Sequence, residues 1–277
     1  MSDTIPITKP VAPQKSAFTA PSDVPVKQEF PTEQIDLPSE GHFYPVGSPL
    51  SDGRIELKYM TAKEEDILTS QNLIKKGIVL DELLKALIVT QGVELTDLLI
   101  GDKNAIFIAS RRLAYGDKYP AKVTCPKCEK ENESEIDLAQ LKSREFDFSQ
   151  FTKGENVFTF ALPYSKKSIT YKLLTHKDEQ NIDSELKGLA KLNKTGSSPE
   201  MTTRLKYMIV SVDGETDRGK IKTFVDNLPS RDSVAFRKHV RDNTPDIDMN
   251  FNFKCAHCEH EERMGLPLGV DFFWPSS

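Results

Sequence analysis

The stretch that decides the fold is Ile55-Glu-Leu-Lys-Tyr-Met-Thr-Ala-Lys-Glu-Glu65, because its pattern returns 114 residues later as Ile169-Thr-Tyr-Lys-Leu-Leu-Thr-His-Lys-Asp-Glu179. In both stretches apolar and polar residues first alternate, which predicts a strand, and the chain then continues into a predicted helix. A threonine before each helix is suited to cap it, and an acidic residue three positions later is the expected capping-box partner. These predicted caps are Thr61 with Glu64 and Thr175 with Asp178.

Three further pairs of segments recur in the same order along the chain. Chance does not readily produce four similar segments in one order, so we infer an internal duplication. The pairs are the turn of a predicted hairpin at 49–51 and 163–165, a predicted buried helix at 84–90 and 205–211, and predicted helices at 102–115 and 232–243, which each begin 23 residues before a cysteine pair.

The duplication predicts an α+β fold built from two tandem repeats. Each repeat is expected to contain a β-hairpin, several helices and a strand–CxxC–strand unit. The predicted units are an extended N-terminal arm at residues 1–37, a first repeat at 38–145 and a second repeat at 146–277.

The four cysteines form two pairs, Cys125-Pro-Lys-Cys128 and Cys255-Ala-His-Cys258. This spacing lets both thiolates of a tight turn face one metal ion, and two such turns complete the tetrahedral four-cysteine site that is usual for structural zinc. The 126 residues between the pairs are unusual, but a duplication explains them because each repeat contributes one knuckle. We therefore predict one structural zinc ion per chain, held in a zinc ribbon that the two repeats share.

Two other interpretations of the cysteines stay open. One is a redox dithiol, which would be expected at the start of a helix that follows a strand and needs a lowered thiol pKa. Acidic residues follow both pairs here, and their charge disfavours thiolates that lack a metal. A mixed site could instead recruit a histidine next to the second pair, either His257 or His260. The simpler expectation is that both histidines lie on the surface.

The N-terminal arm differs in composition from the rest of the chain. It carries six prolines, no glycine and only scattered apolar residues such as Ile5, Phe18 and Phe30. Such a segment cannot bury enough apolar surface to fold alone, so we expect an extended arm that docks on a neighbouring subunit. A plain linker is the alternative.

Composition and motifs argue against several classes of function. The net charge of −5 and the pI of about 5.7 disfavour a nucleic-acid-binding protein, which would show a basic face. No apolar run approaches the roughly 20 residues that span a membrane, and no export signal is recognisable, so folding in a reducing cytoplasm is expected. Phosphate-binding loops and nucleophile elbows are missing from the sequence, so we expect no catalysis and no small-molecule substrate.

The segment at 266–275 gathers two phenylalanines and the single tryptophan of the chain. Aromatic side chains at this density are typical either of a packed core or of a peptide that docks on a partner. We expect core packing, with docking as the alternative.

Two CxxC pairs occur together with Leu37-Pro-Ser-x-Gly-x-Phe-Tyr-Pro, Met60-Thr-Ala-Lys-Glu-Glu-Asp-Ile-Leu, Leu99-Ile-Gly-Asp-Lys-Asn and Gly269-Val-Asp-Phe-Phe-Trp-Pro. This set of segments resembles the T4-type baseplate hub family of contractile-tailed phages. The resemblance covers the chain from about residue 36 onward and implies a structural component of the tail baseplate, assembled in the host cytoplasm, with other baseplate, hub and tail-tube proteins as partners. One alternative is a hub assembly factor that is absent from the mature virion, and another is a zinc-ribbon adaptor unrelated to phage.

Overall fold

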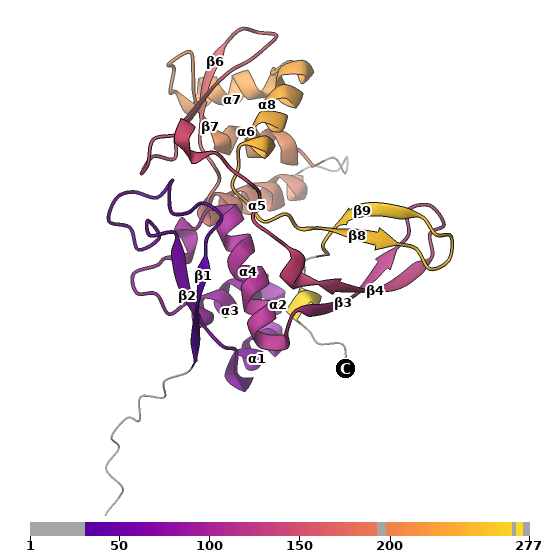
Figure 1. Cartoon of the computed structure of the whole chain (residues 1–277). Coiled ribbons are helices and arrows are strands. Elements are labelled where there is room, and N and C mark those ends of the chain that lie inside the picture. Colours follow the sequence, from indigo (N-terminus) through magenta and orange to yellow (C-terminus); the bar gives the residue numbers. More distant parts are fainter. Residues whose placement is uncertain (1–30, 193–197, 268–269, 274–277) are drawn as a thin grey trace, which may run out of the picture. The chain divides into compact units, whose positions relative to one another are not determined.

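Alternating apolar residues build the first hairpin of the fold. Strand β1 (Thr32–Asp36) pairs antiparallel with β2 (Arg54–Lys58), and Ile35 lies opposite Ile55 in the register. The computed structural model, shown in Figure 1, describes residues 31–192, 198–267 and 270–273. Residues 32–36, which are predicted to belong to the arm, instead form β1, because Ile35 packs against the core beside β2. Residues 1–30 of the predicted arm lie outside the described residues.

Four α-helices follow this hairpin. Helix α2 ends at Gly77, whose backbone is left-handed with φ of 70°, a conformation that glycine adopts without strain. Helix α3 buries Val79, Leu83 and Leu87, which recur every four residues and form one apolar face. The four helices are α1 (Ala62–Thr69), α2 (Gln71–Lys76), α3 (Val79–Leu87) and α4 (Ile100–Tyr115).

The predicted helix at 84–90 is wrong in its last three residues. Helix α3 ends at Leu87, and Ile88 forms a bridge to Leu57 while the Val89 N–H donates to the Glu56 carbonyl at 3.0 Å. Three consecutive β-branched residues, Ile88 to Thr90, favour an extended backbone next to an open strand edge. The same correction applies to 205–211, where the helix ends at Met208 and strand β7 begins at Ile209.

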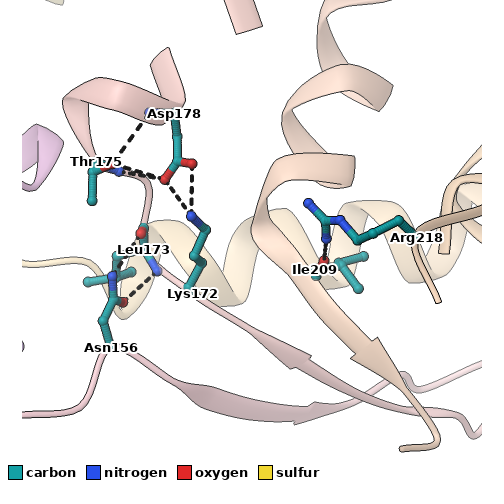
Figure 2. Close-up of polar contacts among 7 residues, drawn as sticks. All are labelled: Asn156, Lys172, Leu173, Thr175, Asp178, Ile209 and Arg218. Atoms are coloured by element: carbon teal, nitrogen blue, oxygen red, sulfur yellow. Dashed lines mark hydrogen bonds and ion pairs between the residues drawn. The ribbon is translucent and has the colours of Figure 1, made fainter. Parts of the chain in front are cut away.

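The described part of the second half also begins with a hairpin and contains four α-helices, α5 to α8. Its hairpin gains β7 as a third strand, in the order β5-β6-β7. The capping residues predicted for α5 are observed, since Thr175 and Asp178 exchange hydrogen bonds and Lys172 joins them (Figure 2). The elements are β5 (Phe158–Ala161), β6 (Ser168–Tyr171), α5 (His176–Leu192), α6 (Glu200–Met208), β7 (Ile209–Val212), α7 (Arg218–Asp226) and α8 (Ser230–Asp242).

Each half ends in a two-stranded antiparallel hairpin that carries one cysteine pair at its turn (Figure 1). In β3 the side chains of Tyr119, Ala121 and Val123 are buried and alternate with exposed ones. The hairpins are β3 (Lys118–Thr124) with β4 (Glu131–Asp137), and β8 (Asn250–Lys254) with β9 (Glu261–Gly265). The fold is therefore α+β with small antiparallel sheets, as predicted.

Backbone pairing joins the two halves directly. Leu99, before α4, forms a bridge with Thr175, before α5, and the Ile100 N–H donates to the Leu174 carbonyl at 3.2 Å. A glycine is required nearby, because a Cβ at Gly101 would lie 2.0 Å from the Pro245 carbonyl oxygen. The close approach of the backbones at Gly101 and Pro245 thus depends on the absence of a side chain at Gly101.

Aromatic side chains fill the core beside the segment that links the halves. The Phe43 ring is 2% exposed and lies 5.1 Å from Phe158 and 5.8 Å from Phe151, between ring centroids. At the other end of the chain Phe272 and Phe273 are fully buried against Phe107, so core packing is confirmed for these two residues. Trp274 lies outside the described residues. No described helix is both long and apolar enough to cross a membrane.

Candidate metal centre

The first cysteine pair lies in a tight turn between β3 and β4. The Cys125 N–H donates to the Lys130 carbonyl, and the Glu129 N–H donates to the Cys125 carbonyl, each at 2.9 Å. Glu129 has a left-handed backbone with φ of 58°, which closes the turn. These bonds fold the loop so that both thiols of the pair face the same side.

The second pair has the same turn between β8 and β9. The Cys255 N–H donates to the His260 carbonyl at 2.8 Å, and the Glu259 N–H donates to the Cys255 carbonyl at 3.0 Å. Glu259 is left-handed with φ of 56°. The His257 N–H also points at Cys255 Sγ at 3.4 Å, a contact that favours a thiolate over a thiol.

The two turns bring all four sulfur atoms together. Cys125 Sγ lies 3.7 Å from Cys258 Sγ, Cys128 Sγ lies 3.6 Å from Cys255 Sγ, and all four lie within 4.8 Å of one another. Zinc–sulfur bonds of about 2.3 Å in a tetrahedron place sulfur atoms about 3.8 Å apart. The cluster therefore has the ligand type and dimensions of a metal site that two distant segments share.

Electrostatics in the cluster favour binding of a cation. Burial opposes ionisation of Cys255, but hydrogen bonds from the His257 and Cys258 backbone N–H groups and from the thiols of Cys128 and Cys258 lower its pKa to about 6. At Cys258 a backbone hydrogen bond from His260 favours the thiolate, while burial and the three other sulfurs outweigh it and raise the pKa to about 12. Four thiolates this close repel one another, and a bound dication removes that repulsion.

Asn132 ties the two turns together beside the sulfur atoms. Its side-chain oxygen accepts a hydrogen bond from the Ala256 N–H of the second turn at 2.8 Å, and its amide donates to the Lys130 carbonyl of the first at 2.9 Å. The side chain is 5% exposed, so both bonds lie away from water. Such contacts around a metal site fix the orientation of its ligands. An asparagine within a strand carries no recognisable signal in the sequence, so the role of Asn132 is evident only from the structure.

The structure does not place either histidine among the sulfur atoms. His257 is exposed, and the His260 ring contacts Glu262 at 3.2 Å. Both cysteine pairs lie in turns between strands, whereas a redox pair is expected at the start of a helix. The described geometry thus favours four sulfur ligands over the mixed site or the dithiol.

A second polar cluster, which the sequence did not indicate, lies where the halves meet. His176 at the start of α5 is 4% exposed at its side chain and contacts Asp81 of α3, with Nε2 3.0 Å from the carboxylate. Lys103 of α4 lies 2.8 Å from the other ring nitrogen and 3.2 Å from Asp81. Burial opposes ionisation of Asp81, yet the hydrogen bond from His176 and the charge of Lys103 lower its pKa.

This cluster lines a cleft of about 760 Å³ that has α2, α3 and α4 on one side and α5 and α6 on the other. His176 pairs with Asp81 across the cleft, and Arg204 of α6 pairs with Glu179 of α5 on one side of it at 2.5 Å. The arrangement joins the two halves and satisfies its own charges, so we interpret it as a structural junction.

One family comparison matches almost the whole described chain. The family described as T4 bacteriophage base plate protein matches residues 36–274. No curated protein and no solved structure gives a match.

Proposed function

This chain belongs to the family of T4 bacteriophage base plate proteins, and on that premise we propose that it is a non-catalytic structural subunit of the baseplate hub. Membership places the protein in the tail baseplate of the virion, in association with other baseplate proteins. The hub is supported by the resemblance of the segments 37–45, 60–68, 99–104 and 269–275 to hub subunits.

We further propose that the four cysteines hold one structural zinc ion. The observation that carries this proposal is the position of Cys125, Cys128, Cys255 and Cys258, whose sulfur atoms lie within 4.8 Å of one another. Four sulfur ligands leave no open coordination position, which suits a structural role and does not suit catalysis. Zinc binding by small modules is worth about 10–16 kcal/mol apparent at neutral pH, so the ion would hold the two halves together strongly.

We also propose that the chain arose from two copies of one unit. Equivalent polar networks at the start of α1 and α5 support this. Glu64 accepts hydrogen bonds from the Thr61 N–H at 2.9 Å and from Lys58 at 2.8 Å. At the corresponding positions Asp178 accepts from the Thr175 N–H at 3.0 Å and from Lys172 at 2.8 Å.

Backbone hydrogen bonds recur at matching positions as well. The Lys103 N–H donates to the Leu99 carbonyl at 2.9 Å, and the Ser233 N–H donates to the Pro229 carbonyl at 2.9 Å. The second bond follows the first by as many residues as the second cysteine pair follows the first pair. Further matched pairs, written as donor and acceptor, are Asp97–Glu94 with Asn227–Phe224, Leu98–Leu95 with Leu228–Val225, and Glu82–Ile78 with Thr203–Pro199.

A buried aspartate begins the last helix of each half. Asp102 in α4 accepts hydrogen bonds from the Ser39 N–H at 2.9 Å and from the Tyr44 hydroxyl at 2.6 Å. Asp232 in α8 accepts hydrogen bonds from the Tyr164 N–H at 2.7 Å and from the Ser165 N–H at 2.9 Å. In each half the donors come from the loop inside the hairpin. The aspartate therefore holds the hairpin loop against the start of the last helix in both halves.

The test of the proposed role is the quantity of this chain in purified, intact particles. Quantitative mass spectrometry would compare it with other tail proteins in the same sample. A fixed small-integer ratio is expected for a hub subunit. Absence from finished particles, together with presence in assembly intermediates, would overturn the proposal in favour of an assembly factor.

A further inference from the structure

Exposed apolar side chains gather at the start of α8. Three of the five large apolar side chains that are exposed in the described chain lie there, with Tyr164 60%, Met201 48% and Val234 57% exposed. Met201 Sδ lies 3.8 Å from the Ser233 hydroxyl, and Arg231 lies 5.8 Å from the centroid of the Tyr164 ring. We call the surface that Tyr164, Met201 and Val234 form the α8 patch. Apolar side chains that gather in this way mark an interaction surface.

The α8 patch occupies the place that is covered in the first half of the chain. The spacing of the matched hydrogen bonds assigns Met201 to the position of Leu80, Ser233 to that of Lys103 and Val234 to that of Asn104. Those three first-half residues line the cleft that α5 closes. Among the described residues no segment covers the equivalent surface of the second half, where Met201 and Val234 remain exposed. This step rests on the duplication proposed above.

Backbone groups at the α8 patch match those that form the internal junction. In the junction the Ile100 N–H donates to the Leu174 carbonyl at 3.2 Å, and the His176 N–H donates to the Leu98 carbonyl at 2.8 Å. The groups equivalent to Ile100 N–H and Leu98 carbonyl are Ser230 N–H and Leu228 carbonyl. Neither takes part in a hydrogen bond among the described residues.

A proline at position 229 does not block such pairing. Its equivalent in the first half is Leu99, whose N–H donates to the Tyr44 hydroxyl at 2.9 Å and takes no part in the junction. The second half can therefore lack that donor without losing a junction hydrogen bond.

The surface that would cover the α8 patch is present on α1. Helix α5 covers the first half through His176, Glu179 and Gln180, and the equivalent residues of α1 are Ala62, Glu65 and Asp66. All three of these α1 residues are exposed. Their two acids complement Arg231 and Arg237, which are exposed on α8. We call Ala62, Glu65 and Asp66 the α1 face.

We propose that the α8 patch binds the α1 face of a second copy of this chain, head to tail, and so repeats between molecules the junction found inside each one. The two surfaces differ, so the contact is heterologous. Such contacts generate closed rings or filaments according to the rotation between neighbours.

Sedimentation velocity of the full-length, zinc-loaded chain over a range of concentrations tests this proposal. The wild type is expected to form oligomers that grow with concentration. Val234→Asp should weaken the association about tenfold or more, because it places a charge in a buried apolar contact. Asp66→Arg should weaken it similarly from the other surface. An equimolar mixture of the two variants should form dimers and nothing larger, because each variant keeps one intact surface.

Val157→Asp is the matched control, since Val157 is 55% exposed and lies outside both surfaces. It should assemble like the wild type. A wild type that stays monomeric throughout would overturn the proposal, and so would an Asp66→Arg variant that assembles normally, which would mean that the α8 patch binds something else. Zinc content and thermal melting of the same samples are measured in parallel. Monomers that retain zinc and melt normally would refute head-to-tail assembly while leaving the zinc proposal intact.

Discussion

Cys125 Sγ lies 3.7 Å from Cys258 Sγ, so the first cysteine of one knuckle faces the second cysteine of the other. The other two sulfur atoms, of Cys128 and Cys255, make the reciprocal contact at 3.6 Å. Neither knuckle alone offers four ligands. A metal ion at this position would therefore depend on both halves of the chain.

We predict one zinc ion per chain and a large loss of stability when a ligand is removed. Cys258→Ser should lower the zinc content to near zero and the melting temperature substantially, because the remaining thiolates lose their counter-charge. Elemental analysis and calorimetry with and without a chelator measure both effects. His257→Ala and His260→Ala serve as controls that should keep the metal. Zinc loss in either histidine variant would support the mixed site instead.

The two threonine caps should contribute about equally to stability. Thr61→Ala and Thr175→Ala each remove a hydroxyl from a capping box, which costs about 1 kcal/mol. Urea denaturation would measure the free energy of unfolding of both variants. Thr69→Ala, at the exposed end of α1, is the control and should cost less. A large difference between the two cap variants would count against equivalent roles.

The buried aspartates should respond to pH in opposite directions. Burial raises the pKa of Asp232, but hydrogen bonds from Tyr164 and Ser165 outweigh it, so the pKa lies below its usual value. Its stabilising contribution is therefore complete above the unfolded pKa of about 3.9 and is lost as the pH falls through the folded value. The cost of Asp232→Asn should shrink in acid.

Asp102 should show the reverse dependence. Burial raises its pKa more than the hydrogen bonds from Ser39 and Tyr44 lower it. The folded state then favours the protonated acid, so this residue contributes most below the unfolded pKa and less as the pH rises through the folded value. The cost of Asp102→Asn should grow in acid. Denaturation curves between pH 3 and pH 7, a range of about one unit below to three above the unfolded value, compare the two variants, and parallel profiles would contradict the assignment.

The C-terminal aromatics should be essential to the core. Phe273→Ala is expected to cost about 3–5 kcal/mol, because the side chain is fully buried against Phe107 and leaves a cavity when removed. Chemical denaturation measures the loss. Val46→Ala, at a position 89% exposed, is the control and should be nearly neutral. A neutral Phe273→Ala would mean that this segment does not hold the body together.

Features encoded within a few residues were predictable from the sequence. The capping boxes were found because threonine and an acid three positions later satisfy each other locally. The cysteine knuckles were found for the same reason, since two-residue spacing alone makes the turn. The burial of Phe272 and Phe273 also followed the expectation from their density.

Contacts between distant residues were not predictable in this way. Asp81 and His176 each look like ordinary surface residues in their own helices, and only the packing of α3 against α5 pairs them. Strand β1 was missed because a short strand after a proline-rich stretch depends on its partner β2 for stability. The change from helix to extended chain at Ile88 likewise depends on the free edge of β2.

The position of the second knuckle has a consequence for biosynthesis. Cys255 and Cys258 are translated more than a hundred residues after Cys128. Cys125 and Cys128 therefore leave the ribosome before the two cysteines that complete the cluster. Phe272 and Phe273, which fill the core beside α4, are translated later still. The chain can therefore bring all four sulfur atoms together, and pack Phe272 and Phe273 beside α4, only after residues 255–273 have been translated.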